Sequence, residues 1–125
     1  MLTDRPLVGF VPTTDLARAR SFYEGTLGLR VGHEDGFALV VDAGGTTVRV
    51  TLVDAFEPQP FTVLGWAVDD VGAAARELVA RGIAFERFGF LEQDDDGVWT
   101  APSGDHVAWF KDPDGNTLSL GDTGS

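Results

Sequence analysis

One pattern of secondary structure occurs twice in this 125-residue chain, and this repeat most constrains the fold. Residues 15–20 align with residues 70–75, and Gly28 then matches Gly82 with one residue deleted. Each copy begins with an apolar, strand-like run, continues with an amphipathic helix and ends with several short strands. Because a chain of this length fits one domain, the repeat predicts a single α+β domain over residues 1–125, built from two similar modules.

The modules are predicted over about residues 5–54 and 62–122, and residues 55–61, with Pro58 and Pro60, are typical of a linker. In module one we expect strands at 7–12, 29–31, 37–42 and 46–53, and a helix from Leu16 that Gly28 ends. Gly44 and Gly45 favour a hairpin turn between the last two strands. In module two we expect strands at 63–68, 83–85, 97–101, 107–111 and 117–120, and a helix from Val71 that Gly82 ends.

Composition and charge exclude several classes of function. The absence of cysteine excludes disulfides, thiolate nucleophiles and cysteine-bound metals. A net charge of −11 repels phosphate backbones, so no nucleic-acid partner is expected. The same charge favours solubility or the steering of a cationic small molecule. Since neither a signal-peptide pattern nor a membrane-length apolar run is visible, we expect a cytoplasmic protein with no membrane partner.

Four motifs carry a resemblance to a known family. They are DLARARSFY at 15–23, LGL at 27–29, VDDV at 68–71 and WFKDPDGN at 109–116. In this order they resemble the vicinal-oxygen-chelate superfamily, which includes glyoxalases, bleomycin resistance proteins and dioxygenases, and the resemblance covers about residues 7–120. It implies two βαβββ modules that form a curved mixed sheet around a cavity, and it also implies a homodimer.

The resemblance places the metal-ligand positions on residues that do not suit a metal. Metal-dependent members of the superfamily use His, Gln or Glu from four strands, and the corresponding positions here are Val8, Val63 and Ser119, with the fourth near Arg49 or Thr51. Valine offers no lone pair, and arginine repels a cation. We therefore expect a member of the superfamily with no metal and no other cofactor.

Other sequence features offer few alternatives for metal binding or nucleophilic catalysis. His33 and His106 are the only histidines, and we interpret them as surface or hydrogen-bonded side chains. The Asp112 and Asp114 pattern resembles the start of a calcium loop, but Thr123 stands where the loop needs glutamate. Turn chemistry explains these aspartates better. No serine lies in a nucleophile elbow.

The resemblance implies that Val8, Val63 and Trp109 face the cavity and that Phe110 packs behind the sheet, and strand alternation extends this assignment along each strand. Trp66 and Leu52 are expected to pack on the helix side, whereas Phe88 and Phe90 either close over a ligand or pack. Arg49 needs a carboxylate or an anionic ligand group as partner, unless it is an exposed edge charge. The orientation that the resemblance implies, together with the rim of the loop 102–105, yields the predicted ligand-binding set: Phe10, Arg49, Thr51, Trp99, His106, Trp109 and Ser119.

Three functions fit these observations. The preferred hypothesis is a metal-free small-molecule-binding protein of the bleomycin-resistance type, which sequesters a drug or metabolite in an apolar cavity with few polar groups. The second is an enzyme, such as a lyase, an isomerase or a dioxygenase-like protein, that acts on a small oxygenated metabolite. The third is a scaffold without a ligand. The fold alone does not choose between them.

Overall fold

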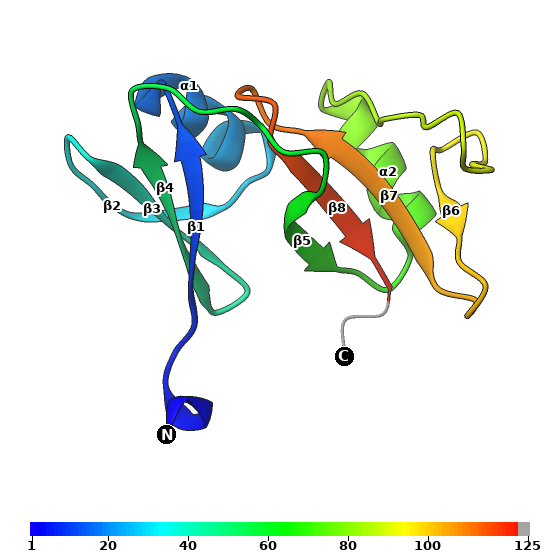
Figure 1. The fold of residues 1–125 in the computed structure, drawn as a ribbon, viewed down its shortest axis with the longest axis horizontal. Coiled ribbons are helices and arrows are strands. Elements are labelled where there is room, and N and C mark those ends of the chain that lie inside the picture. Colours follow the sequence, from blue (N-terminus) through cyan, green and yellow to red (C-terminus); the bar gives the residue numbers. More distant parts are fainter. Residues whose placement is uncertain (123–125) are drawn as a thin grey trace. The chain divides into compact units, whose positions relative to one another are not determined.

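The computed structural model describes residues 1–122 and contains two compact units, Met1–Glu57 and Pro58–Ser125. The boundary falls within the predicted linker. Each unit is a four-stranded mixed sheet with a helix against one face (Figure 1). We call the opposite face of each sheet its open face. Among the described residues, no helix is long and apolar enough to cross a membrane.

Unit one is a mixed sheet of strand order β1-β4-β3-β2. Its elements are the 3-10 turn η1 (Leu2–Asp4), β1 (Val8–Thr13), α1 (Leu16–Arg20), the π-helix η2 (Ser21–Thr26), β2 (Arg30–Glu34), β3 (Ala38–Ala43) and β4 (Thr46–Leu52). Strand β1 pairs with β4 in parallel, and β3 is antiparallel to both of its neighbours. Gly44 and Gly45 adopt φ of 58° and 88°, and two consecutive positive φ angles are what a tight hairpin between β3 and β4 requires.

Unit two repeats this topology, with strand order β5-β8-β7-β6. Its elements are β5 (Thr62–Ala67), α2 (Val71–Ala80), β6 (Trp99–Thr100), β7 (His106–Lys111) and β8 (Thr117–Gly121). Strand β5 pairs with β8 in parallel, and β7 is antiparallel to both β8 and β6. In both units the first strand therefore pairs with the last. The predicted fold of two similar α+β modules is confirmed.

The repeated motifs cap the two helices in the same way. The carboxylates of Asp15 and Asp70 each accept a hydrogen bond, at 3.0 Å, from the backbone N–H three residues on. Gly28 and Gly82 follow the helical segments with φ of 76° and 97°, in the left-handed region that favours glycine. Sequence repeats of this kind therefore reflect identical local hydrogen bonding at both helix starts.

The helix of module one differs from the prediction of a single α-helix. The α-helical part ends at Arg20, and a π-helix continues to Thr26. The N–H of Leu27 donates to the carbonyl of Phe22, five residues back, so the turn holds one residue more than an α-helical turn. Within it, Tyr23 is only 1% exposed and contacts Phe22 edge-on.

Strand alternation sorts the side chains of each sheet. In β4, Val48 and Val50 are buried on the α1 side, while Arg49 between them is half-buried on the open face. The prediction that Leu52 packs with these valines is wrong, because the sheet ends at this residue and leaves it 41% exposed. In unit two, Phe110 is fully buried and stacks on Trp66, as predicted for the helix side.

The segment between α2 and β6 is irregular, and the predicted strand at 83–85 is absent. Only a single bridge joins Phe85 to Phe110, and the N–H of Glu86 donates to Trp109. The side chain of Gln93 bonds three further backbone groups: its oxygen accepts from the Phe88 N–H, and its nitrogen donates to the carbonyls of Glu86 and Gly97. These side-chain bonds replace a strand ladder.

Candidate functional site

The open face of unit two holds two predicted ligand-binding residues as direct neighbours. Trp109 of β7 lies opposite Ser119 of β8, and Ser119 lies opposite Gly65 of β5. A Cβ atom added to Gly65 would meet the Ser119 hydroxyl oxygen at 2.7 Å, so this hydroxyl lies directly over the glycine. The centre of the face therefore combines an indole ring with a small polar group.

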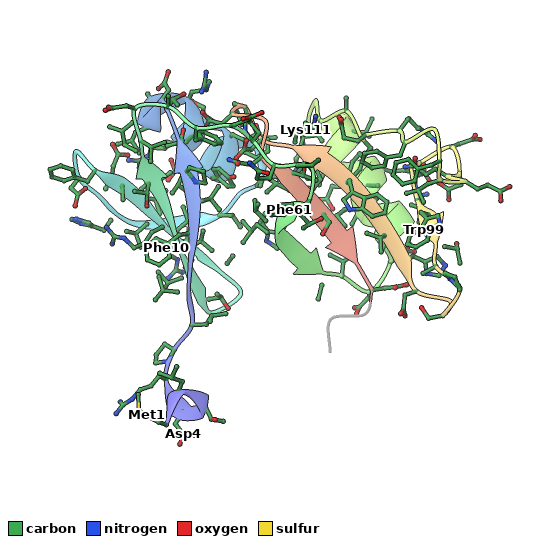
Figure 2. All side chains as sticks on the ribbon, viewed as in Figure 1. Met1, Asp4, Phe10, Phe61, Trp99 and Lys111 are labelled. Atoms are coloured by element: carbon green, nitrogen blue, oxygen red, sulfur yellow. The ribbon has the colours of Figure 1, made fainter. Side chains whose placement is uncertain are left out.

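Aromatic rings extend this face toward the sheet edge. The Trp109 ring lies 6.0 Å from the Trp99 ring and 5.4 Å, edge-on, from Phe88, which in turn lies 5.7 Å from Phe90. We call Phe88, Phe90, Trp99 and Trp109 the aromatic cluster. Two of its members lie on β6 and β7, and two come from the irregular segment; Figure 2 shows Trp99. Phe90 is 83% exposed, so the cluster offers ring surface to solvent.

The open face of unit one carries the other strand residues of the predicted set. Phe10 of β1 lies opposite Arg49 of β4 and is 65% exposed (Figure 2), and Thr51 lies on the same face two residues after Arg49. Asp35 lies within electrostatic range of Arg49. The backbone N–H groups of Phe37 and Ala38 chiefly lower the pKa of Asp35, and Arg49 adds to this effect. Arg49 thus has a carboxylate nearby.

His106 lies apart from these residues. It is the first residue of β7, so alternation places it on the α2 side with Phe110 rather than beside Trp109. Its backbone N–H and its ring Nδ1 both bond the carboxylate of Asp122, at 2.7 and 2.5 Å. These two bonds lower the pKa of Asp122, the backbone bond most. The pair lines a pocket of about 350 Å³ at the start of α2.

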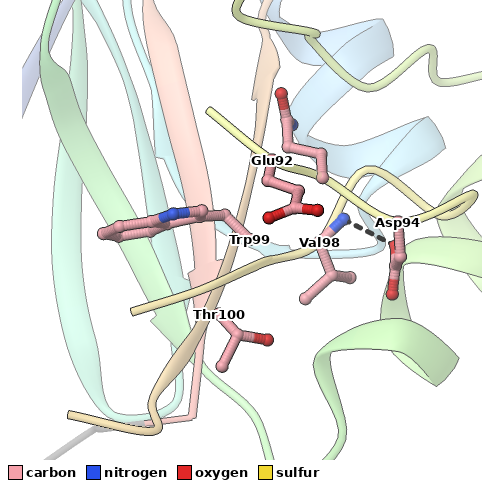
Figure 3. Close-up of a pocket in the computed structure, with 6 residues that line it drawn as sticks. Glu92, Asp94, Val98, Trp99 and Thr100 are labelled. Atoms are coloured by element: carbon pink, nitrogen blue, oxygen red, sulfur yellow. Dashed lines mark hydrogen bonds between the residues drawn. The ribbon is translucent and has the colours of Figure 1, made fainter. Parts of the chain in front are cut away.

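A second pocket, of about 380 Å³, opens where residues 92–94 meet residues 98–100 (Figure 3). Its lining residues are Glu92, Gln93, Asp94, Val98, Trp99 and Thr100. Of these, the sequence predicted only Trp99 as a site residue. The sequence pattern does not identify Glu92 as a site residue, because the irregular segment follows neither the alternation of a strand nor the period of a helix.

The comparisons with known proteins establish the family. The chain belongs to the Glyoxalase/Bleomycin resistance protein/Dioxygenase superfamily, whose family model matches residues 7–120. A member of this superfamily from Sphaerobacter thermophilus is similar in structure, with 23% identity, a TM-score of 0.73 and coverage of 97% of this chain and 98% of that chain. No curated protein sequence matches the chain.

Two other solved structures show how widely the fold is used. A bleomycin-binding protein complexed with bleomycin is 21% identical, with a TM-score of 0.73 and coverage of 94% of this chain and 97% of that chain. A lactoylglutathione lyase from Agrobacterium tumefaciens is 19% identical, with a TM-score of 0.72 and coverage of 94% and 92%. At these identities the likeness extends to the fold alone.

The residues present do not fit the divalent metal of the metal-dependent superfamily members. Val8 and Val63 occupy strands β1 and β5 with side chains that have no donor atom, and Ser119 offers a single neutral hydroxyl. Within residues 1–122, no three histidine, aspartate or glutamate side chains gather closely enough to hold a metal ion. Hard divalent cations need several charged or strongly polar oxygen or imidazole donors at one point.

The residues that resemble a calcium loop form a turn between β7 and β8. The carboxylate of Asp112 accepts from the backbone N–H groups of Asp114 and Asn116, both at 2.9 Å, and from the Asn116 amide at 2.8 Å. Asp112 is 5% exposed and Asn116 is 3% exposed. Both carboxylate oxygens of Asp112 are thus engaged within the turn, as turn chemistry predicts.

Proposed function

We propose that this chain is a metal-free small-molecule-binding protein that sequesters a drug or metabolite. The observation that carries the proposal is the aromatic cluster on the open face of unit two, with the Ser119 hydroxyl beside it. Stacked and edge-on rings provide a large apolar surface with a defined shape, and small-molecule sites typically combine such a surface with a few polar groups.

Further observations support binding rather than metal-assisted catalysis. The resemblance places two of the superfamily's ligand positions at Val8 and Val63, whose side chains have no donor atom and are partly exposed. A structurally similar protein was solved with bound bleomycin. Phe10, Arg49 and Thr51 remain proposed ligand contacts on the open face of unit one, where Arg49 suits an anionic group of a ligand.

One observation favours a second candidate function, an enzyme that works by acid–base chemistry. Asp122 holds His106 through its Nδ1 atom, which leaves Nε2 available on a side chain that is 47% exposed. A carboxylate that orients an imidazole in this way is typical of general bases. This candidate predicts that His106→Ala abolishes turnover of a small oxygenated substrate, whereas the binding proposal predicts no effect of that substitution on ligand affinity.

The binding proposal is tested with two probes, bleomycin and the dye 1-anilinonaphthalene-8-sulfonate, added to protein treated with EDTA. We expect at least one probe to quench tryptophan emission saturably and to raise the melting temperature. Trp109→Ala should weaken this binding about tenfold or more, because it removes the central ring of the cluster. Trp66→Phe is the matched control, since Trp66 stacks on Phe110 behind the sheet.

Three outcomes would contradict the proposal. If neither probe changes the tryptophan emission or the melting temperature, the result favours the hypothesis of a scaffold without a ligand. If binding appears only after a divalent metal is added back, the protein is not metal-free in function. Equal losses in Trp109→Ala and Trp66→Phe would show that the open face is not the site.

A further inference from the structure

Some polar side chains that line the pocket at residues 92–100 already make hydrogen bonds within the protein, whereas others do not. The Gln93 amide makes three hydrogen bonds to the backbone, at 2.8 to 2.9 Å, which use both of its N–H donors and one of the two lone pairs of its oxygen. One oxygen of Asp94 accepts from the N–H groups of Asp96 and Val98, both at 2.9 Å. Figure 3 shows the bond to Val98. Gln93 and Asp94 therefore shape the pocket.

Two other lining groups are available. Within residues 1–122, the Glu92 carboxylate and the Thr100 hydroxyl make no hydrogen bond or ion pair, although both line the pocket. Among residues 1–122, Arg87 on the neighbouring stretch forms no ion pair with Glu92, and its guanidinium donates to the carbonyls of Asp94 and Asp95. A carboxylate with no ion-pair partner within residues 1–122 thus lies at a pocket that the half-buried Trp99 also lines.

We propose that this pocket binds the protonated amino group of a small organic molecule. Its lining has acceptors in Glu92, Asp94 and Thr100, and it has no basic side chain, so it suits a cation and repels an anion. Trp99 adds an aromatic surface that attracts an ammonium group and its alkyl chain. The volume of about 380 Å³ fits a small organic cation rather than a macromolecule.

The charge of the whole chain acts in the same direction. A net charge of −11 raises the local concentration of cations near the surface, and an unpaired carboxylate selects among them. The proposal goes beyond the open-face binding function and does not depend on it, since Glu92 and Thr100 belong to the pocket whether or not the aromatic cluster holds a ligand.

The experiment follows the indole N–H signals of ¹⁵N-labelled protein by NMR during titration with n-butylammonium chloride at constant ionic strength. The chain has three tryptophans, and Trp99→Phe assigns the signal of Trp99. We expect this signal to shift saturably with a dissociation constant in the millimolar range, as is usual for one exposed ion pair with one cation–π contact. The neutral probe 1-butanol should produce a clearly smaller shift.

The matched pair of variants is Glu92→Gln and Asp95→Asn. Each removes one negative charge from the same loop, but only Glu92 lines the pocket, while the Asp95 side chain is exposed outside it. Because long-range steering is equal in both, the difference isolates the local contact. We expect Glu92→Gln to weaken n-butylammonium binding about three- to fivefold, and Asp95→Asn to change it by less than about 1.5-fold.

Three results would overturn the proposal. They are the absence of a saturable shift at Trp99 in the wild-type chain, equal responses to n-butylammonium and 1-butanol, and equal losses in the two variants. Amide spectra of each variant report whether the fold is intact, and Glu92 is exposed, so its replacement leaves the core in place. Failure of this test leaves the probe binding at Trp109 unaffected, so the two proposals fail separately.

Discussion

At the scale of single residues, carboxylates in this protein take distinct roles according to their hydrogen bonds. Asp112 is engaged on both oxygens within a turn, Asp70 caps a helix, and Glu92 makes no bond within residues 1–122. Asp122 differs again, because it binds both the backbone and the ring of His106. These differences in partners, rather than residue type, separate structural carboxylates from a candidate recognition group.

Asp122 provides a prediction about pH. Its pKa is lowered in the folded state, first by the backbone N–H of His106 and then by the imidazole, so ionised Asp122 favours folding. This contribution is fully present above the ordinary carboxyl pKa of about 4 and is lost as the pH falls through the lower folded-state pKa. We expect Asp122→Asn to lower the melting temperature at about pH 7 and the difference from wild type to shrink toward about pH 2.

The control for this prediction is Asp95→Asn, at an exposed loop position. It should show little difference from the wild type across the same pH range. The other charged residues that line the pocket around His106 stay the same in both variants: Asp69, Asp70, Arg76, Asp94 and Asp96. A difference for Asp122→Asn that stays constant with pH would contradict the assignment.

At the scale of elements, the helices owe their positions to a repeated cap. Helix α2 begins where Asp70, in extended backbone conformation, accepts the N–H of Ala73, and α1 begins at Asp15 with the same geometry. Val71 and Ala75 then bury one face of α2 against β7 and β8. The cap decides where the helix starts, and the apolar stripe decides which face it buries.

The cap leads to a prediction about stability with a built-in control. Asp70→Ala removes the acceptor for the Ala73 N–H and should lower the free energy of unfolding by about 1 kcal/mol, measured by urea denaturation. Asp69→Ala removes the neighbouring carboxylate, which makes no hydrogen bond within residues 1–122, and should have a smaller effect. Equal losses would mean that charge near the helix start, rather than the cap, stabilises α2.

At the scale of the whole molecule, exposed apolar side chains predict association. Leu7, Phe10 and Phe37 of unit one are 76%, 65% and 76% exposed. Large apolar side chains exposed in this number are typical of interaction surfaces, because removing them from water is favourable. The resemblance of the sequence motifs implies a homodimer, and the exposed residues of unit one suit that expectation.

We therefore predict a homodimer in solution. Light scattering coupled to size-exclusion chromatography should yield twice the chain mass of 13.3 kDa. Phe10→Asp should shift the protein toward the monomer, because it places a charge on an apolar surface. Val79→Asp is the control, since Val79 is 53% exposed on α2 rather than on the open face. A monomeric wild type at micromolar concentration would contradict the prediction.

The sequence by itself determined the features that arise from local physical chemistry. The resemblance of the motifs, extended by strand alternation, placed Trp109 and Ser119 on one face and Phe110 behind it. The capping aspartates marked both helix starts, and the repeat predicted two modules of the same topology. Each of these depends on neighbours a few residues away, or on the two-residue period of a strand, and a sequence displays both directly.

Only the tertiary structure decided the rest, because it depends on contacts between residues distant in sequence. The strand predicted at 83–85 is absent, and the Gln93 side chain bonds the backbone of Glu86, Phe88 and Gly97 in the irregular segment that follows. His106 begins β7 one residue earlier than predicted and therefore lies on the α2 side, where its ring bonds Asp122, sixteen residues on. Glu92 lines a pocket with Trp99 and Thr100 because the irregular segment folds back on β6. This contact follows neither the two-residue period of a strand nor the period of a helix, so the sequence pattern does not predict it.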